Sequence, residues 1–247
     1  GFENNALMNP VGMVNLAQSL ASIKKLVFDE KHVTLTELKR ILDDNWENHE
    51  ELRQQCLKTP QFGNDIDEID NIVADLYSTW AHFTNTMPAA YGGFFRTSAI
   101  SVTSHQPGGA LVGATPDGRF AKETLADACV SPPRGQDKNG PLAVFKSAMK
   151  VKQDLFQAML MNMKFHPSAL KTEEDLKKLA SAIRVYFANG GKHVQFNVID
   201  TKALREAQKN PSKYENLMVR VAGYSAYFIH LTKPIQEEII ERTEHKI

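Results

Sequence analysis

The alternation of predicted strands and helices after Pro141 restricts the fold more than any other feature of this sequence. Apolar periodicity predicts helices at 142–152, 173–187, 202–209 and 234–244, of which the third is short. Strands are predicted between them at 158–165 and 194–199, and a hairpin at 220–228 precedes the last helix. Strands separated by helices usually pair in parallel, because the crossover helix returns the chain to the end where it started. The second half of the chain is therefore predicted to build parallel βα units in an open sheet or a barrel.

The first 86 residues differ from this second half, because helical periodicity runs through almost all of them. The apolar spacing predicts helices over 11–28, after Thr34 or Thr36 as a cap, over 47–57 and from Asp65 onward. The N-terminal part is therefore predicted to be helical.

A loop-rich stretch joins the two parts, and glycine and proline punctuate it from residue 88 to residue 140. Only 97–104 reads as a strand within it. Long loops in compact domains usually have a function or are disordered, so this stretch is a candidate to contribute to a site.

Charge and cysteine content exclude several classes of function. Lys and Arg total 29 and Asp and Glu total 29, so neither nucleic acid nor an anionic membrane is expected as an obligatory partner. Cys56 and Cys129 lie far apart and outside any CxxC motif, which argues against a disulfide framework or a zinc site. No apolar run reaches membrane-spanning length and no signal-peptide pattern opens the chain, so we expect a cytoplasmic protein.

The histidines, acidic residues and serines show none of the standard site spacings. The eight histidines form no HExxH pair and no GxSxG elbow is present, so neither a metal site nor a serine nucleophile is predicted. His105, His166 and His193 lie near Gly-rich segments or strand ends and are candidates to face a site. The acidic run at 65–70 lacks the register of a calcium loop, and helix capping explains it more simply.

A lone glycine, Gly223, interrupts the strand-like run RVAGYSAYF at 220–228. Its β-branched and aromatic neighbours favour a strand, whereas glycine weakens a strand interior. Taken in isolation, the run is explained by a tight turn between two strands. The turn GATPDGR at 113–119 is also unusual, because an arginine directly follows its turn residues.

Together, five segments resemble the C-terminal part of the glycyl radical enzymes, the family of pyruvate formate-lyase and of the glycerol and choline lyases. In the family's order they are GATPDGR (113–119), SPPRGQDKNGP (131–141), GGKHVQFNVID (190–200), AQKNPSKYENLMVRVAGYSAYF (207–228) and IIERTEH (239–245). The resemblance covers essentially the whole chain, densely from about Gly113 onward. MNMKFHPSAL (161–170) and QFNVID (195–200) favour the dehydratase and lyase branch, and within it the glycerol dehydratase-like group.

The resemblance implies that Gly223 stores an organic radical. A separate radical S-adenosylmethionine activating enzyme with an iron–sulfur cluster would remove its α-hydrogen, and no metal or organic cofactor would stay bound during turnover. A planar Cα radical shares spin with the flanking amides, and glycine suits it because a Cβ would crowd that geometry. Such a radical must be kept from water and oxygen, which suggests a loop among apolar strands. Arg220, Tyr224 and Ser225 flank the glycine and are expected to position its loop.

The fold implied by the resemblance is α/β, the C-terminal half of a ten-stranded β/α barrel of the glycyl radical enzyme type. A helical N-terminal section and a C-terminal glycine-radical loop belong to it. We expect 1–112 to form the mostly helical part of the barrel domain and 113–247 to form the glycine radical domain. The N-terminal half of the barrel is missing, so we expect a longer native polypeptide, and relatives are commonly homodimers.

In the family the glycyl radical draws a hydrogen atom from a cysteine, and neither cysteine here suits that role. Cys56 lies in a helical pattern, and Cys129 lies in a different segment from the family's cysteine loop. The thiyl cysteine is therefore expected on the missing N-terminal half, and the substrate is expected to be a small molecule. His105 and Asn197 are candidates for the substrate side.

The resulting prediction is a glycyl radical lyase that cleaves a C–O bond, or a C–N, C–S or C–C bond, in a small substrate. Two alternatives stay open. One is a stand-alone module that restores the radical of a damaged partner, although such modules are shorter and resemble pyruvate formate-lyase around the glycine. The other is a catalytically inert relic, which failure of Gly223 to form a radical would support.

Overall fold

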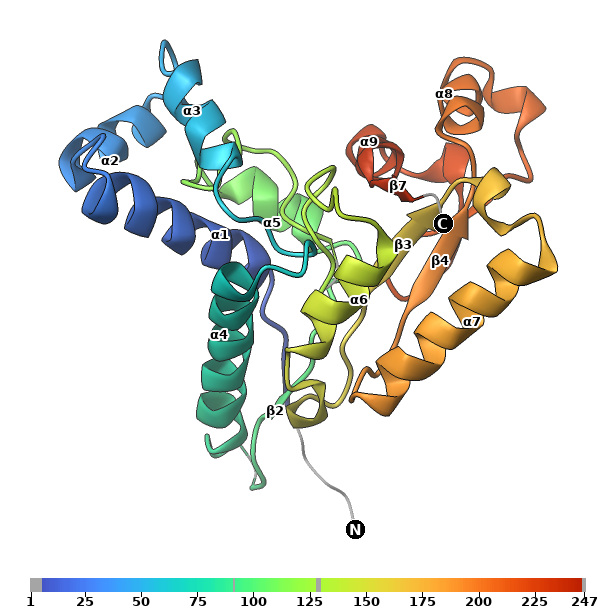
Figure 1. Ribbon diagram of the computed structural model, residues 1–247, viewed down its shortest axis with the longest axis horizontal. Helices are drawn as coiled ribbons and strands as arrows, with labels where there is room; N and C mark the ends of the chain where they lie inside the picture. Colours follow the sequence, from blue (N-terminus) through green and yellow to red (C-terminus); the bar gives the residue numbers. More distant parts are fainter. Residues whose placement is uncertain (1–5, 91, 128–129, 246–247) are drawn as a thin grey trace.

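The computed structural model describes residues 6–90, 92–127 and 130–245, which form a helical part and a part built around a small parallel sheet (Figure 1). The helical part contains α1 (Met13–Ile23), the π-helical segment η1 (Lys24–Asp29) that continues it, α2 (Leu35–Asp43), α3 (Glu50–Leu57) and α4 (Asp67–Asn85). All four predicted helices are confirmed. Thr34, rather than Thr36, caps α2, because its hydroxyl accepts the Glu37 N–H at 3.2 Å while Glu37 accepts the Thr34 N–H at 2.9 Å.

The predicted strand at 97–104 is confirmed only at its start, where Ala99 forms a parallel bridge with Met159, and is wrong beyond Ala99. Strand β2 (Arg96–Thr97) pairs in parallel with β1 (Leu7–Met8), and the chain then turns and enters helix α5 (His105–Leu111). The backbone turns because the Ser104 N–H donates to the Ser101 carbonyl at 2.7 Å. The helix escaped prediction because proline and two glycines fill its sequence HQPGGAL.

The second half shows the predicted alternation of helices and strands. Its helices are α6 (Pro141–Met149), α7 (Glu173–Ala188), α8 (Thr201–Lys209) and α9 (Lys233–Glu241), and its short helical turns are η2 (Gln153–Leu155), η3 (Pro167–Leu170), η4 (Pro211–Lys213) and η5 (Phe228–His230). Its strands are β3 (Asn162–Phe165), β4 (Gln195–Val198), β5 (Met218–Arg220), β6 (Ser225–Tyr227) and β7 (Glu244–His245). The α/β class is therefore confirmed.

The parallel sheet in the described part of the chain has three strands in the order β4-β3-β7. Asn162 pairs with Gln195 at one end of β3, and Phe165 pairs with Val198 and with His245 at the other. The predicted helix at 234–244 is wrong at its end, because α9 stops at Glu241 and the chain then pairs with β3 as β7. Figure 1 shows α8, α9 and β7 gathered near the C-terminal end of the chain.

Three apolar clusters fill the interior, and the second of them matters most for the site. It joins α8 and α9 to the β5–β6 hairpin through buried side chains, namely Leu204, Ala207, Val219, Val221, Phe228, Ile235, Ile239 and Ile240. Burial of a large aliphatic or aromatic side chain stabilises by roughly 1.5–3 kcal/mol, so this cluster holds the hairpin firmly on the two helices. Within the described residues, no helix has the length and apolar character to cross a membrane.

Candidate functional site

Gly223 lies in the turn of the β5–β6 hairpin, and its backbone conformation explains why the strand-like run contains a glycine. The strands pair antiparallel, Arg220 faces Ser225, and the Val221 N–H donates to the Tyr224 carbonyl at 2.9 Å. At this turn Gly223 adopts φ +90°, a region that residues with a Cβ rarely enter. The positive φ of this tight turn therefore favours glycine at position 223, independently of any further role of the residue.

The immediate surroundings of Gly223 are apolar on one side and open on the other. A Cβ at this position would lie 3.2 Å from Leu160 Cδ1 and 3.8 Å from Ile100 Cγ2. The preceding Val221 and Ala222 are fully buried, whereas Gly223 itself is exposed in this chain. The expected shielding from water is therefore not provided by the residues that the structure describes.

Two polar side chains of β4 hold the strand that leads into Gly223. Asn197 pairs with the backbone of Arg220 in both directions, because its Nδ2 donates to the carbonyl at 2.7 Å and its Oδ1 accepts the N–H at 2.8 Å. Gln195 Oε1 accepts the Gly223 N–H at 3.3 Å and the Arg220 guanidinium at 2.8 Å. Residues two apart on a strand share a face, so β4 presents both amides to the hairpin.

The carbonyl of Val221, two residues before the glycine, is a second anchor. It accepts from Asn162 Nδ2 at 3.0 Å and from Arg242 Nη2 at 2.9 Å. Asn162 begins β3 and also donates to Asp127 and accepts from Gln195. Since these partners are all buried, the backbone on the N-terminal side of Gly223 is fixed by a connected polar network.

A buried charge cluster supports this network. Arg242 pairs with Asp127 at 2.9 Å and with Glu238 at 2.8 Å, and all three side chains are almost completely buried. Burial, the largest single influence, raises the pKa of Glu238, but Arg242 and His105 together outweigh it and lower that pKa to about 2. Burial raises the pKa of Asp127 against the opposing effect of Arg242. The cluster ties α9 to the hairpin through one guanidinium.

The predicted positioning residues lie around the glycine as expected from their sequence position. The Arg220 guanidinium donates to Ser225 Oγ at 3.0 Å, which closes the hairpin across its two strands. Tyr224 packs against the apolar cluster beneath the hairpin, and burial raises its pKa. What these three side chains do during turnover stays a prediction.

The two candidates for the substrate side lie close to the hairpin and the buried cluster. Asn197 lies beneath the hairpin, where it bonds the Arg220 backbone. His105 begins α5 and is fully buried, with Nε2 at 3.8 Å from a Glu238 carboxylate oxygen. Neither ring nitrogen of His105 has a hydrogen-bond partner among the described residues. In this chain both side chains face protein rather than an open cavity.

The two cysteines do not complete the site in this chain. Cys56 is buried in α3, in an apolar cluster that contains no residue of the hairpin, and burial raises the pKa of its thiol to about 12. Cys129 lies outside the described residues. The unusual turn GATPDGR is structural, because Asp117 accepts from Asn15 at 2.7 Å and the buried Arg119 donates to the Glu123 carbonyl at 2.7 Å.

Sequence reasoning missed the buried residues that hold the hairpin, which are Asp127, Asn162, Gln195, Glu238 and Arg242. Gln195 carried a usable signal, because it alternates with Asn197 along a predicted strand and marks a polar strand face. The others lie in loops, at a strand start or in a helix end, and no local pattern distinguishes them.

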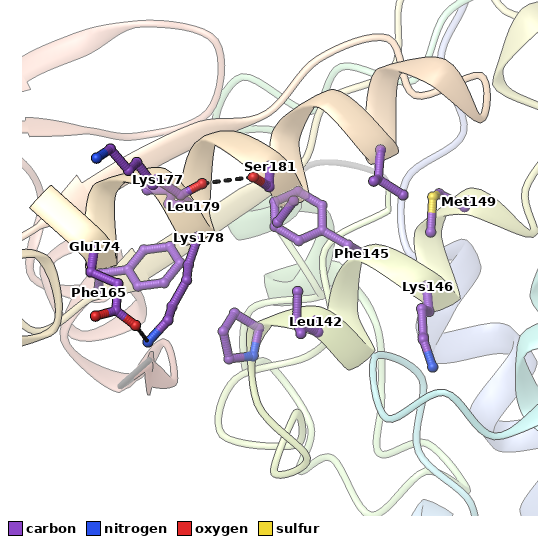
Figure 2. A pocket seen from close by; sticks show the side chains of 13 residues that line it. Leu142, Phe145, Lys146, Met149, Phe165, Glu174, Lys177, Lys178, Leu179 and Ser181 are labelled. Carbon is purple, nitrogen blue, oxygen red and sulfur yellow. Dashed lines mark hydrogen bonds and ion pairs between the residues drawn. The ribbon is translucent and has the colours of Figure 1, made fainter.

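A separate apolar groove of about 660 Å³ lies between α6 and α7 (Figure 2). Phe145 and Phe165 form part of its wall, and Lys146, Lys177 and Lys178 lie at its edge. The hairpin contributes none of the residues that line this groove. It is therefore distinct from the surroundings of Gly223.

Comparison with known proteins identifies the family of this arrangement. A glycine radical family model matches residues 126–229, and a pyruvate formate lyase-like family model matches residues 2–109. Among curated proteins, trans-4-hydroxy-L-proline dehydratase of Clostridioides difficile is 39% identical over 98% of this chain and 30% of its own length. Indoleacetate decarboxylase of Tractidigestivibacter scatoligenes is 40% identical over 95% of this chain and 29% of its own length.

Solved structures show the same relationship. Glycerol dehydratase from Clostridium butyricum superposes with a TM-score of 0.94 and 46% identity over 99% of this chain and 31% of that one. Hydroxyproline dehydratase from Clostridioides difficile superposes with a TM-score of 0.95 and 38% identity over 99% of this chain and 31% of that one. The chain thus spans about three tenths of the length of these relatives. With Gly223 inside the matched glycine radical segment, this chain belongs to the glycyl radical enzyme family.

Proposed function

We propose that Gly223 carries the glycyl radical of a dehydratase whose other catalytic groups lie outside these residues. The observation that carries the proposal is the geometry of the hairpin turn. A glycine with φ +90° lies there, and buried amide and guanidinium groups fix its N–H and the carbonyls that precede it. A stored radical needs a fixed position relative to its reaction partner, because small displacements sharply reduce transfer rates.

The chemistry follows from the resemblance to the family. A radical S-adenosylmethionine activating enzyme with an iron–sulfur cluster would supply a deoxyadenosyl radical, which takes one hydrogen atom from the Gly223 Cα. The unpaired electron then spreads over the flanking peptide groups. The remaining Cα–H is the only substituent besides the backbone, so no side chain forces the carbon out of plane.

During turnover the Gly223 radical would take the hydrogen atom of a cysteine S–H and leave a thiyl radical. The thiyl would take a hydrogen atom from the substrate, and the same hydrogen would return to the product radical. We place this cysteine on the N-terminal half of a ten-stranded barrel, since Cys56 is buried in α3 in an apolar cluster that contains no residue of the hairpin. This chain would supply the C-terminal half of that barrel.

The matched relatives support dehydration as the reaction class. Their printed names include glycerol, trans-4-hydroxyproline and 1,2-propanediol dehydratases, alongside decarboxylases. We propose a small substrate with a hydroxyl group next to the carbon that loses hydrogen, so that water leaves from the adjacent carbon. The division into parts at 1–112 and 113–247, a homodimer and a cytoplasmic setting stay predictions.

The substrate class is tested with the complete polypeptide after anaerobic activation. We would incubate it with glycerol, 1,2-propanediol, trans-4-hydroxyproline and an arylacetate, and measure aldehyde, imine and carbon dioxide formation. Turnover of a hydroxylated substrate is expected. Decarboxylation alone would refute the dehydratase assignment while leaving the radical at Gly223 intact.

A further inference from the structure

A polar pocket lies where two turn-rich segments of the sequence, GATPDGR (113–119) and SPPRGQDKNGP (131–141), meet helices α1 and α3. Its volume is about 240 Å³, and the loop residues in its wall come from 117–119, 123–126 and 133–136. The radical hairpin contributes none of its lining residues. The pocket therefore gives two segments that have no part in the chemistry of Gly223 a common location.

Two buried polar side chains in the wall of this pocket are not satisfied by the protein. Gln18 of α1 is 1% exposed, and its carboxamide forms no hydrogen bond with any residue in the described part of the chain. The Thr124 hydroxyl in the same wall is also buried and also has no partner among the described residues. Folded proteins nearly always satisfy buried amides and hydroxyls with protein groups, water or a ligand. The wall is therefore suited to a polar occupant.

A buried positive charge lines the same pocket. The Arg119 guanidinium donates to the Glu123 carbonyl at 2.7 Å and to Thr115 Oγ1 at 3.1 Å, but it forms no ion pair with a carboxylate within the described ranges. Burial lowers the pKa of Arg119 against the opposing charges of Asp117 and Glu123, and the charge of Arg134 lowers it further. Because buried charges are usually paired, an anion in the pocket would be attracted by both guanidinium groups.

Arg134 keeps most of its N–H groups available. Its Nη1 donates at 2.6 Å to Glu241 of α9, whose side chain is 47% exposed, and no other described residue accepts from this guanidinium. The side-chain amide of Gln136, which also lines the pocket, forms no hydrogen bond between residues 6 and 245 where the structure describes them. Guanidinium and amide groups therefore offer several free donors.

The other charged groups of the lining are engaged within the protein. Asp117 accepts from Asn15 Nδ2 at 2.7 Å, and Glu123 accepts a backbone N–H at 3.2 Å. Arg53 donates to both carboxylate oxygens of Glu50, at 2.7 and 2.8 Å. The hydrogen-bonding groups that are left over are therefore mainly donors, and a cationic ligand would meet three guanidinium groups.

We propose that this pocket binds one small oxyanion, a carboxylate or a phosphate, through Arg134 and Gln18. A guanidinium presents paired N–H groups that match two oxygens of either anion, and the amide adds a further donor. The volume of about 240 Å³ lies below the roughly 300 Å³ at which pockets for drug-sized ligands begin, which favours a small anion. The proposal does not depend on the radical at Gly223.

A bound anion would join parts of the chain that are far apart in sequence. Gln18 belongs to α1 of the helical part, whereas Arg134 belongs to the loop before α6 and bonds Glu241 of α9. The same helix α9 carries Glu238 of the buried charge cluster. Binding should therefore stabilise the packing of the helical part against the C-terminal segment.

The test uses the complete polypeptide at constant ionic strength with chloride as the background anion. Inorganic phosphate and acetate are titrated separately, and binding is measured by calorimetry and by the shift of the melting temperature. Gln18→Leu removes the buried amide at similar volume, and Arg134→Gln removes the charge. The matched controls lie outside the pocket: Gln157→Leu alters an exposed glutamine, and Arg205→Gln breaks another arginine pair with α9.

Wild type and both controls are expected to bind one equivalent of phosphate or acetate, and both pocket variants should bind it about tenfold or more weakly. The anion that binds more tightly identifies the ligand class as phosphate or carboxylate. Without added anion, Gln18→Leu should melt at or above the temperature of wild type, because an apolar side chain replaces a buried amide that has no partner. Its melting temperature should not rise when the anion is added.

Two results would overturn the proposal. One is equal affinity for the anion in wild type and in both folded pocket variants. The other is the absence of saturable binding of either anion to wild type, because water alone would then satisfy the polar groups of the wall.

Discussion

Arg242→Met tests the buried network that holds the radical hairpin. The arginine pairs with Asp127 and Glu238 and also donates to two hairpin carbonyls, of Arg220 at 3.3 Å and of Val221 at 2.9 Å. Methionine fills similar volume but leaves both carboxylates buried without a cation. Removal of one partner from a buried ion pair costs about 3–5 kcal/mol. We therefore expect the hairpin and α9 to lose stability on that scale.

The stability lost in Arg242→Met depends on pH, and the direction of this dependence follows from the carboxyl pKa values. In the wild type burial raises the pKa of Glu238, but Arg242 and His105 together bring it from 4.5 to about 2. The ionised group therefore stabilises the fold at pH values above its unfolded pKa, and this contribution disappears as pH falls. Without the arginine, burial remains the largest influence and raises the pKa of both carboxyls, opposed only by His105 beside both of them and by Asn162 beside Asp127. The variant therefore loses stability as pH rises, and the deficit should be larger at about pH 8 than at about pH 5.

Hydrogen exchange of residues 217–228 in the complete polypeptide measures this effect. A loss of about 3–5 kcal/mol corresponds to roughly a hundredfold to several thousandfold faster exchange near pH 8. The matched control is Arg205→Met. Arg205 of α8 pairs at 2.5 Å with Glu237 of α9, the helix that also carries Glu238, but both side chains of this pair are about two-fifths exposed. That change should cost less than about 1 kcal/mol. Equal exchange in the two variants would refute the role given to Arg242.

The other predictions concern backbone support and glycine packing. Asn197→Ala removes both bonds to the Arg220 backbone and should cost about 1–3 kcal/mol, measured as faster hairpin exchange, with exposed Asn189→Ala as the control. Unchanged exchange would show that the pairing is dispensable. Gly109→Ala should lower the melting temperature, because its Cβ would lie 2.2 Å from a backbone oxygen, whereas Gly113→Ala, with nothing within 4 Å, should not. Equal melting temperatures would contradict this packing.

Much of the fold follows from local pattern. Periodicity placed the helices and the βα alternation, because amphipathic faces and capping residues such as Thr34 and Thr172 are encoded within a few positions. The ends of elements were less predictable. Strand β7 is a two-residue element that exists only through its pairing with β3, which lies about 80 residues earlier in the chain.

In the candidate site, too, residues with a local sequence signal could be predicted, and residues placed by distant contacts could not. Gly223 was identifiable because its motif stands among other motifs of the family and its turn needs positive φ. Arg242 and Asp127 were not, because the contact between them joins a loop to a helix end across more than 100 residues.

The radical at Gly223 is tested most directly by electron paramagnetic resonance of the complete polypeptide. The sample is treated anaerobically with a radical S-adenosylmethionine activating enzyme proven on a relative, together with reductant and S-adenosylmethionine. The matched control for Gly223→Ala is Gly190→Ala, because Gly190 has nearly the same φ of +89° and no atom within 4 Å of a new Cβ. Each substitution should cost about 1–2 kcal/mol of backbone strain, so loss of folding alone would affect both variants.

We predict a doublet in wild type and Gly190→Ala that is absent from folded Gly223→Ala, and cleavage of the backbone at residue 223 after exposure to air. A silent wild-type spectrum, or an undiminished doublet in Gly223→Ala, would contradict the assignment of the radical to Gly223.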